Sequence, residues 1–274
     1  MTPSSFAARP TRAIVIAAGR GKRLRPYTDA APKCLVPVGG RSILEWQLRA
    51  FRACGVRDVI VIRGYRGEVL ADRLPELGGD IRLVDNPDWE QNNILESLFF
   101  ADAELDGPLL LSYSDIVFTE SVAARAAGAP GDIALVIDRD FASIYEGRTE
   151  HPLDEAEVAE VRGGRVTRVG KRALAPEDAQ GEFIGLVKLS SEGAATLRAA
   201  WAELRMRYEG RRDAPFQRAP SFRAAYLTDM LQYLIDAGHA LRPVEIRGGW
   251  REIDTAQDLE RAERAARDLE EEGS

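Results

Sequence analysis

A short segment near the N-terminus combines small residues, glycines and clustered positive charge. Small side chains let a ligand approach the main chain, glycine adopts the conformations of a tight loop, and N–H groups and cations attract phosphate oxygens. The pattern predicts a loop whose backbone binds a polyphosphate; the alternative is an arginine-rich surface turn without a ligand. The residues expected to form this phosphate-binding loop are Ala17, Ala18, Gly19, Gly21, Lys22 and Arg23.

The spacing of these glycines excludes two common nucleotide-binding motifs. A Walker A loop needs Gly-x-x-x-x-Gly-Lys-Ser/Thr, whereas Gly19 and Gly21 are two positions apart and no hydroxyl follows Lys22. The dinucleotide motif Gly-x-Gly-x-x-Gly would place its third glycine where Leu24 stands. The remaining pattern is Gly-x-Gly-x-Arg-Leu, with a Pro-Lys pair that ends nine residues after the leucine.

Two aspartates that are far apart in the sequence are candidate metal ligands. Asp115 follows an apolar run, and Asp254 stands just before the last helical segment. Magnesium prefers hard oxygen ligands and commonly takes one or two carboxylates together with substrate phosphates. We therefore expect Asp115 and Asp254 to bind Mg²⁺. For Asp254 the alternative is a helix N-cap, a role that Thr255 could also fill.

The glycine loop and the Pro-Lys pair resemble the signature of the nucleotidyltransferases that join a nucleoside triphosphate to a phosphorylated sugar or alcohol. The resemblance implies that a phosphate oxygen of the acceptor attacks the α-phosphorus and that pyrophosphate leaves, so that positioning and charge neutralisation are the main tasks. It implies catalytic roles for Arg23 at the triphosphate, Lys33 at the α-phosphate or incoming phosphate, and Lys171 at the acceptor phosphate. It also implies that Asp115 and Asp254 hold the metal jointly.

The segment expected to contact the base departs from the sugar-1-phosphate members, which usually carry a Gln…Pro-x-Gly-Thr-Ala stretch. The stretch Asn92-Asn93-x-x-x-Ser97-Leu is similar to the branch that activates phosphocholine and related phospho-alcohols or phosphonates with CTP. It implies that these two asparagines and the serine bind the nucleotide, although the asparagines could instead cap the following helix.

The favoured activity is Mg²⁺-dependent transfer of CMP from CTP to a phosphocholine-like or aminoethylphosphonate-like acceptor. One alternative is a sugar-1-phosphate or inositol-phosphate nucleotidyltransferase that uses UTP, GTP or dTTP. The other is an inactive nucleotide-binding regulatory member of the same fold.

The acceptor pocket is expected in the second half of the chain, where aromatic residues accompany carboxylates. This combination suits an ammonium group through cation–π attraction and charge pairing, and it suits a hydroxylated ring equally well. Trp250 and Phe141 would otherwise be plain core residues, and His151 beside Pro152 is expected to be a loop residue rather than a base. The predicted acceptor-binding residues are Lys171, Glu182, Asp138, Tyr145 and Trp250.

Strand-like and helix-like segments alternate along the first half of the chain. The predicted strands are 12–18, 58–63, 81–85, 108–113 and 132–138, and the predicted helices are 42–54, 65–74, 93–103 and 119–127. Ser42 and Glu45 have capping-box spacing at the first helix. Alternation of this kind implies right-handed βαβ crossovers, a mostly parallel sheet, and ligands at the carboxyl ends of its strands.

The second half has shorter strands joined by turns. Strands are expected at 156–161, 165–169, 182–189 and 240–246, helices at 191–208, 222–237 and 255–269, and a mobile loop at 207–220. The predicted fold class is α/β, a Rossmann-like three-layer α/β/α arrangement with a mostly parallel mixed sheet and a substrate-binding elaboration in the second half. We expect one domain, 11–270, with a nucleotide-binding half (11–140), an acceptor-binding half (141–254) and a closing helix (255–270), after a flexible N-terminus (1–10).

Composition limits the possible classes of protein. A chain of 274 residues with 45% hydrophobic and 30% charged residues is typical of a globular protein, and its net charge of −7 argues against a general nucleic-acid binder. No apolar run reaches the length of a membrane span, and residues 1–10 are too short and polar for a signal peptide. Cys34 and Cys54 are expected to be reduced thiols. We therefore expect a cytoplasmic protein without a membrane partner, with a homodimer as one assembly to consider.

Overall fold

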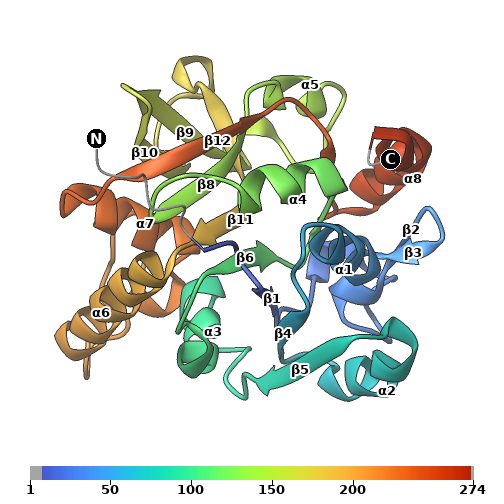
Figure 1. Cartoon of the computed structure of the whole chain (residues 1–274), viewed down its shortest axis with the longest axis horizontal. Coiled ribbons are helices and arrows are strands. Elements are labelled where there is room, and N and C mark those ends of the chain that lie inside the picture. Colours follow the sequence, from blue (N-terminus) through green and yellow to red (C-terminus); the bar gives the residue numbers. More distant parts are fainter. Residues whose placement is uncertain (1–7, 273–274) are drawn as a thin grey trace.

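A computed structural model describes residues 8–272, so residues 1–7 of the predicted flexible N-terminus lie outside the described chain. Its centre is a sheet with the strand order β5-β4-β1-β6-β11-β8-β12-β10-β9 (Figure 1). The strands of this sheet are β1 (Arg12–Ala17), β4 (Asp58–Arg63), β5 (Asp80–Asp85), β6 (Leu109–Tyr113), β8 (Ile133–Asp138), β9 (Glu157–Arg162), β10 (Arg165–Lys171), β11 (Gly181–Leu189) and β12 (Leu241–Ile246).

Strand directions confirm the predicted mixed sheet, although parallel and antiparallel neighbours are equally frequent along the strand order. β1 is parallel to β4 and β6, β4 is parallel to β5, and β12 is parallel to β8. β11 runs antiparallel to β6 and β8, and β10 runs antiparallel to β9 and β12. The strands of the first half therefore have the expected βαβ topology, and the antiparallel additions belong to the second half.

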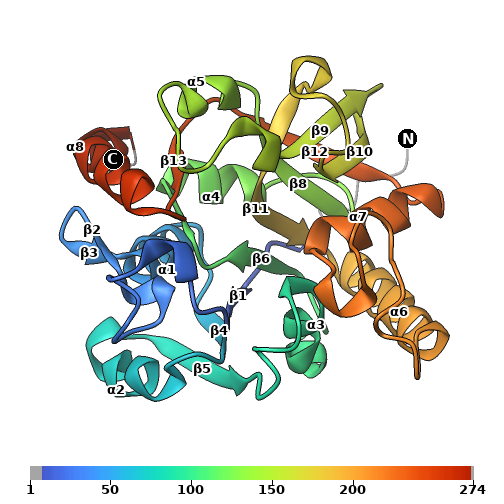
Figure 2. The same cartoon turned by 180° about the vertical axis from the view of Figure 1, so that it is seen from behind.

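Helices cover both faces of the sheet, which confirms the predicted three-layer fold (Figures 1 and 2). One core cluster joins the sheet to α1, α2 and α4, and another joins its other face to α3, α6 and α7. None of the described helices is long and apolar enough to cross a membrane. The helices are α1 (Ile43–Ala53), α2 (Gly67–Leu77), α3 (Ile94–Leu98), α4 (Glu120–Ala127), α5 (Phe141–Tyr145), α6 (Ser191–Arg207), α7 (Leu227–Asp236) and α8 (Ala256–Glu272).

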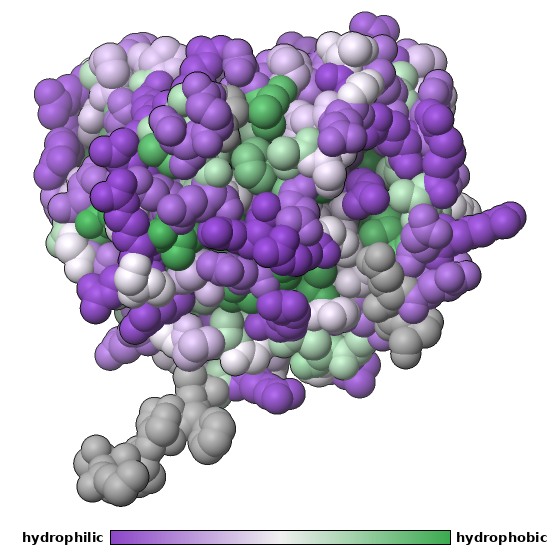
Figure 3. Space-filling model, turned by 90° about the horizontal axis from the view of Figure 1, so that it is seen from above, coloured by the Kyte–Doolittle hydropathy of each residue, from purple (hydrophilic) through white to green (hydrophobic). Residues whose placement is uncertain are grey.

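The closing helix α8 packs against the first third of the chain rather than against the sheet. It contacts the small hairpin of β2 (Pro37–Val38) and β3 (Arg41–Ser42), and its apolar side chains join a third core cluster with Trp46 (Figure 1). The C-terminal helix is thereby held against the hairpin and the start of α1. From above, the surface is mostly hydrophilic, with small separate apolar areas (Figure 3).

Local sequence signals explain several element boundaries. The predicted capping box is present: Ser42 Oγ accepts a hydrogen bond from Glu45 N (3.2 Å), and Glu45 Oε2 accepts one from Ser42 N (2.7 Å). The helix expected at 93–103 is shorter, because α3 ends at Leu98 and continues as a 3-10 helix, Phe99–Glu104. The helix expected at 222–237 is interrupted, because Ala225 is extended and its carbonyl accepts a hydrogen bond from Leu95 N (3.2 Å).

Two short strands that the sequence pattern did not predict position the candidate site. β7 (Ile116–Phe118) and β13 (Trp250–Glu252) pair antiparallel, with Glu252 opposite Ile116. Immediately beyond this pair, Ile253 N donates a hydrogen bond to Asp115 O (2.8 Å). The pairing therefore brings Asp254 beside Asp115 at the carboxyl end of β6.

Candidate active site

The glycine loop that follows β1 is shaped by one glycine in particular. Gly21 has a φ of 64°, in the left-handed region, and begins the short 3-10 helix Lys22–Leu24. A Cβ atom at this position would lie 3.1 Å from Lys33 Cβ, so the loop can close over Lys33 only when residue 21 lacks a side chain. Thr28 Oγ1 donates a hydrogen bond to Gly21 O (2.9 Å) and fixes the turn.

A cavity of about 320 Å³ lies between this loop and the start of α3. Its size is within the range of small-molecule sites. Ala17, the last residue of β1, is buried and is not among the lining residues. The other predicted nucleotide-binding residues all line the cavity: Ala18, Gly19, Gly21, Lys22, Arg23, Asn92, Asn93 and Ser97.

Hydrogen bonds hold the predicted base-contacting segment in place. Buried Asn86, which the sequence pattern did not single out, donates from Nδ2 to Asn92 Oδ1 and to Ser97 Oγ (3.0 Å each). Asn93 stands at the N-cap position of α3, but its side chain makes no capping bond and instead donates to Ala224 O (2.9 Å). The two asparagines therefore order this wall of the cavity, and contact with a base stays a prediction.

Lys33 lies between the two predicted metal ligands. Its Nζ atom is 3.0 Å from Asp115 Oδ2 and also contacts the carboxylate of Asp254, and the side chain is only 8% exposed. Burial disfavours the charged ammonium, but the two aspartates outweigh it and raise the pKa of Lys33 above its usual range. Burial likewise opposes ionisation of Asp254, yet Lys33 and Arg23 hold the pKa of this carboxyl below its usual range.

The same pair of carboxylates fits a magnesium ion. Asp115 Oδ1 is buried and has no hydrogen-bond partner among residues 8–272, so one hard oxygen is available beside the position where Lys33 supplies positive charge. Arg23 contacts Asp254 as well, and its Nη1 is 3.1 Å from Glu155 Oε2. Arg23 and Lys33 thus neutralise carboxylates that a metal ion would otherwise engage.

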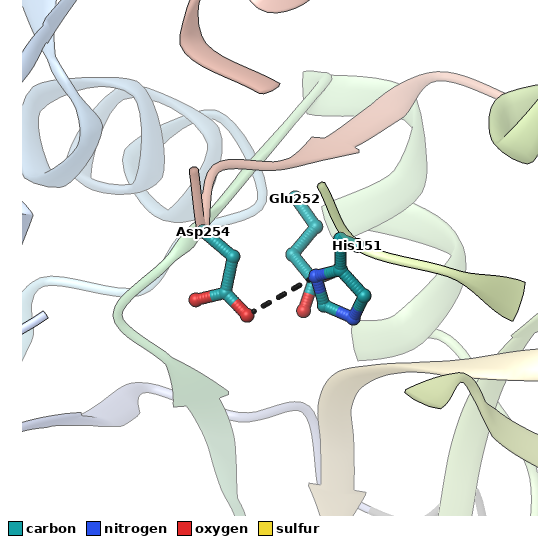
Figure 4. Close-up of side chains that lie close together, drawn as sticks. All are labelled: His151, Glu252 and Asp254. Atoms are coloured by element: carbon teal, nitrogen blue, oxygen red, sulfur yellow. Dashed lines mark ion pairs between the residues drawn. The ribbon is translucent and has the colours of Figure 1, made fainter. Parts of the chain in front are cut away.

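A second group of ligand-type residues surrounds Asp254. Figure 4 shows Asp254, Glu252 and His151 pointing toward one another; His151 Nδ1 is 3.3 Å from Asp254 Oδ2 and 3.6 Å from Glu252 Oε2. The guanidinium of Arg148 already bonds to two members of this group, because its Nη2 is 3.0 Å from His151 Nδ1 and 2.8 Å from Glu252 Oε2. A guanidinium only donates, so His151 Nδ1 accepts its hydrogen bond and has no lone pair left for a metal.

His151 lies in a loop, as expected, but it is buried at the edge of the site rather than solvated. Burial and the charge of Arg148 lower the pKa of His151 to about 4, so the imidazole is neutral near pH 7. Burial and the neighbouring Asp254 raise the pKa of Glu252 well above its usual range. Sequence reasoning set His151 aside as a loop residue and assigned no role to Arg148 or Glu252, because no local pattern connects the three.

A second cavity, of about 190 Å³, opens next to the first and shares Arg23, Asn93, Asp115 and Asp254 with it. The second cavity has a high density of buried carboxyl groups. Its further lining includes Tyr113, Glu155, Glu157, Lys171, Glu182, Phe183, Tyr226, Trp250 and Glu252.

Two of these carboxyls are held by hydroxyl groups. Glu157 accepts hydrogen bonds from Tyr113 (3.0 Å) and Thr228 (2.7 Å); burial raises its pKa to about 7, although these bonds and Lys171 act in the opposite direction. Glu182 accepts a hydrogen bond from Tyr145 (2.6 Å), and its other oxygen is buried without a partner in the described chain. Burial raises the pKa of Glu182 to about 8 against the effect of Tyr145.

The predicted acceptor-binding residues divide into two groups. Lys171, Glu182 and Trp250 line the second cavity, and Lys171 Nζ lies 4.8 Å from the ring centre of Tyr226. Tyr145 and Asp138 do not line it. Tyr145 stands behind Glu182, and fully buried Asp138 accepts hydrogen bonds from Trp250 Nε1 (2.8 Å) and from two backbone N–H groups. All five binding roles stay predictions.

Comparison with known proteins agrees with this geometry. Residues 13–178 match the family described as the MobA-like NTP transferase domain. The chain is 30% identical over 254 residues to the CTP:phosphoglutamine cytidylyltransferase of Campylobacter jejuni, which covers 90% of this chain and 97% of that protein. It is 36% identical over 107 residues to the choline-phosphate cytidylyltransferase of Streptococcus pneumoniae, which covers 39% of this chain and 46% of that protein.

Solved structures show the same fold. The inositol-1-phosphate CTP transferase of T. maritima matches 98% of this chain and 100% of its own, with a TM-score of 0.73 and 21% identity. The family predicted from the glycine loop is thereby confirmed. The chain belongs to the nucleotidyltransferases with a MobA-like NTP transferase domain.

Proposed function

We propose that the protein transfers CMP from CTP to a small phosphorylated acceptor that carries a cationic group, with release of pyrophosphate. The observation that carries this proposal is the placement of two charge environments side by side. A glycine loop with Arg23 and Lys33 meets the carboxylates of Asp115 and Asp254 on one side, and a cavity rich in buried carboxyls opens on the other. The relatives described above support CTP as the donor and a phosphorylated small molecule as the acceptor.

The chemistry needs no protein nucleophile. An acceptor phosphate oxygen forms a bond to the α-phosphorus as the bond between this atom and the oxygen leading to the β-phosphorus breaks, and pyrophosphate leaves with the electron pair. Arg23 and Lys33 are placed to offset the negative charge of these anions. Asp115 and Asp254 would hold Mg²⁺, which supplies further positive charge at the phosphate oxygens when bound.

The carboxyl-rich cavity supports an acceptor with an amine. Glu157 and Glu182 are ionised in part near neutral pH and face aromatic rings, a combination that stabilises an ammonium group through charge pairing and cation–π attraction. A second candidate is an inositol- or sugar-phosphate acceptor, because carboxyls with raised pKa values also donate hydrogen bonds to hydroxyl groups. Retention of Arg23, Lys33, Asp115 and Asp254 speaks against an inactive regulatory member.

The decisive experiment measures pyrophosphate release over a matrix of triphosphates and acceptors. CTP, UTP, GTP, ATP and dTTP are each combined with phosphocholine, phosphoethanolamine, 2-aminoethylphosphonate, phosphoserine, glucose-1-phosphate and inositol-1-phosphate, with Mg²⁺ and with EDTA. We expect release with CTP and an amine-bearing acceptor, and no release with EDTA. Release with glucose-1-phosphate or inositol-1-phosphate alone selects the second candidate. A cytoplasmic location and a homodimer stay predictions from the sequence.

A further inference from the structure

A third cavity, of about 490 Å³, adjoins the carboxyl-rich cavity and contains arginines that the proposed reaction does not use. The two cavities share Glu155, Lys171 and Tyr226 as lining residues. Beyond this shared wall, the third cavity is lined by Asp154, Gly170, Arg172, Arg218, Ala219, Pro220, Thr228 and Asp229. Its distinguishing residues are Arg172 and Arg218, both exposed at its opening.

The guanidinium groups of these two arginines are available to a ligand. Among residues 8–272, neither side chain donates a hydrogen bond to a carboxylate. The nearest buried acid, Asp229, is already occupied, because it accepts hydrogen bonds from Arg218 N (3.1 Å) and Tyr226 N (2.8 Å). Burial raises the pKa of Asp229, and the charge of Arg218 opposes this effect without cancelling it.

The backbone at both arginines is fixed in an uncommon conformation. Arg172 itself has a φ of 55°, and Gln217, directly before Arg218, has a φ of 51°. Left-handed backbone at non-glycine residues is strained and persists where the surrounding structure imposes it. Residues 216–219 are closed by hydrogen bonds between Phe216 and Ala219, so Arg218 stands on a fixed turn rather than on a loose segment.

The arginines and the buried carboxyls are neighbours across Thr228. Thr228 lines the third cavity, and its hydroxyl donates to Glu157 Oε1 (2.7 Å) in the second cavity. Gly170 lies against both Thr228 and Arg218: a Cβ atom there would be 3.5 Å from Thr228 Cβ and 3.9 Å from Arg218 Nη1. The carboxyls of the second cavity and the arginines of the third thus lie on adjoining spaces. A ligand that carries an ammonium and a carboxylate on one carbon atom requires such an arrangement.

We propose that the acceptor is a phosphorylated amino acid, whose carboxylate binds Arg172 and Arg218 while its ammonium group faces Glu157 and Glu182. The inference rests on the proposed function and narrows its acceptor class. Arginine presents parallel N–H donors that match a carboxylate in two-point hydrogen bonding, which lysine cannot do. Lys171, on the wall shared by both cavities, remains on the side of the acceptor phosphate.

The test compares acceptors that differ only by one carboxylate. O-phosphoserine is paired with phosphoethanolamine, and O-phosphohomoserine with 3-aminopropyl phosphate, at fixed CTP and Mg²⁺. Pyrophosphate release by the full-length protein gives kcat/KM for each. For at least one pair we expect the amino acid to exceed the amine by about tenfold or more, because hydrogen bonds to charged groups contribute on this scale.

Variants then connect this preference to the arginines. In Arg218→Gln and Arg172→Gln, the ratio of kcat/KM for amino acid over amine should fall toward one. Arg264→Gln removes an exposed arginine of α8 outside the three cavities and should keep the wild-type ratio. Calorimetric titration of phosphoserine into the protein with Mg²⁺ and a CTP analogue that has a methylene group between its α- and β-phosphates should show weaker binding in both arginine variants.

The outcomes separate the inference from the proposed function. Equal use of both members of every pair, or a preference that persists in both arginine variants, overturns the amino-acid assignment and leaves the cytidylyltransferase proposal standing. Failure of CTP with every phosphorylated amine and amino acid overturns the proposed function. If the proposed function fails in this way, calorimetry still tests the carboxylate site. Phosphoserine that binds the wild type but not Arg218→Gln would support the site, and equal binding to both proteins would contradict it.

Discussion

The two cavities of the candidate active site are built from the sequence in different ways. Most of the nucleotide cavity comes from two contiguous segments, the loop after β1 and the start of α3, each of which carries several polar groups. The carboxyl-rich cavity takes one to three residues from each of many elements, among them β6, β9, β10, β11 and β13. A site made of contiguous segments leaves a readable motif, whereas a site made of isolated residues exists only after the sheet has formed.

The two cavities also differ in how their charged groups are paired. At the proposed metal position, Lys33 contacts Asp115 and Asp254, and Arg23 contacts Asp254 as well, so two cations face two carboxylates. In the neighbouring cavity, Glu157 and Glu182 are buried with hydroxyl partners rather than cations, and burial raises the pKa values of both. The first environment suits the anions and the metal of the proposed reaction, and the second suits the cationic acceptor that we propose.

The largest expected effect comes from Asp254, one of the residues that line both cavities. Asp254→Asn removes a charge that Lys33, Arg23 and the proposed metal share, so turnover should fall by roughly 10³-fold. Pyrophosphate release with CTP and the best acceptor measures this change. The control is Asp102→Asn, which removes a surface carboxylate paired with Arg198 and should leave turnover unchanged. An Asp254→Asn protein with near-normal kcat would remove this residue from the proposed metal site.

The next largest effect is expected at Lys33, which should contribute both to turnover and to the stability of the folded protein. Lys33→Met should lower turnover by about 10²-fold and should also destabilise the metal-free protein by about 3–5 kcal/mol, because Asp115 and Asp254 lose their buried partner. Mg²⁺ should then raise the melting temperature of the variant more than that of the wild type, since the ion replaces the missing cation. Scanning calorimetry with and without Mg²⁺ checks this, and equal shifts in both proteins would contradict a shared metal and lysine position.

Sequence reasoning predicted the parts of the molecule that have local signatures. Alternating strands and helices indicated the α/β fold, the capping box marked the start of α1, and the glycine loop indicated the family. Asp115 and Asp254 were expected to lie together as joint metal ligands, and the structure places both against Lys33.

The remaining residues have no such signature. Glu157 begins the strand Glu157–Arg162, whose residues do not alternate between apolar and polar, and its carboxylate accepts a hydrogen bond from Thr228 of α7. His151 and Arg148 belong to a polar loop, and only the β7–β13 pairing brings Glu252 to them. Their position follows from long-range packing, which periodicity and short motifs do not encode.

A smaller effect should distinguish the two charge environments by pH. Because the pKa of Glu182 is raised to about 8 and that of Glu157 to about 7, both carboxyls lose protons as the pH rises from 6 to 8.5. The kcat/KM for an amine-bearing acceptor should therefore rise over this range, and less steeply in Glu182→Gln, whose value above pH 8 should be about tenfold lower. The KM for CTP should stay unchanged. The same pH slope in variant and wild type would exclude Glu182 as an ammonium ligand.

The stability of the unliganded protein should show the opposite trend. The folded state holds protons on Glu157 and Glu182 that the unfolded chain has released, so the free energy of unfolding falls as the pH rises from the ordinary value of 4.5 through 7 and 8. Urea unfolding at pH 5.5 and pH 8.5 measures this difference. It should be smaller in Glu182→Gln, and a difference equal to that of the wild type would contradict the buried, proton-bearing state.

The smallest effect on activity is expected at Asp138, which the sequence placed in the acceptor pocket and the structure places in the core. Asp138 Oδ2 accepts from Trp250 Nε1, and Oδ1 accepts from Asp140 N (3.0 Å) and Gly248 N (3.1 Å). Asp138→Asn keeps one acceptor oxygen but sets an N–H donor against one of these partners. It should therefore cost about 1–3 kcal/mol of stability while kcat/KM stays within about twofold.

The exposed neighbour Asp140 provides the matched control for this substitution. Its carboxylate pairs with Arg247 at the surface, so Asp140→Asn should change the free energy of unfolding by less than about 0.5 kcal/mol. Urea unfolding and acceptor kinetics on both variants show whether Asp138 supports the fold or binds the acceptor. If Asp138→Asn raised the acceptor KM tenfold at unchanged stability, the residue would act on the ligand. A stability loss with normal kinetics instead makes it a support for Trp250, whose ring reaches the cavity that Asp138 does not.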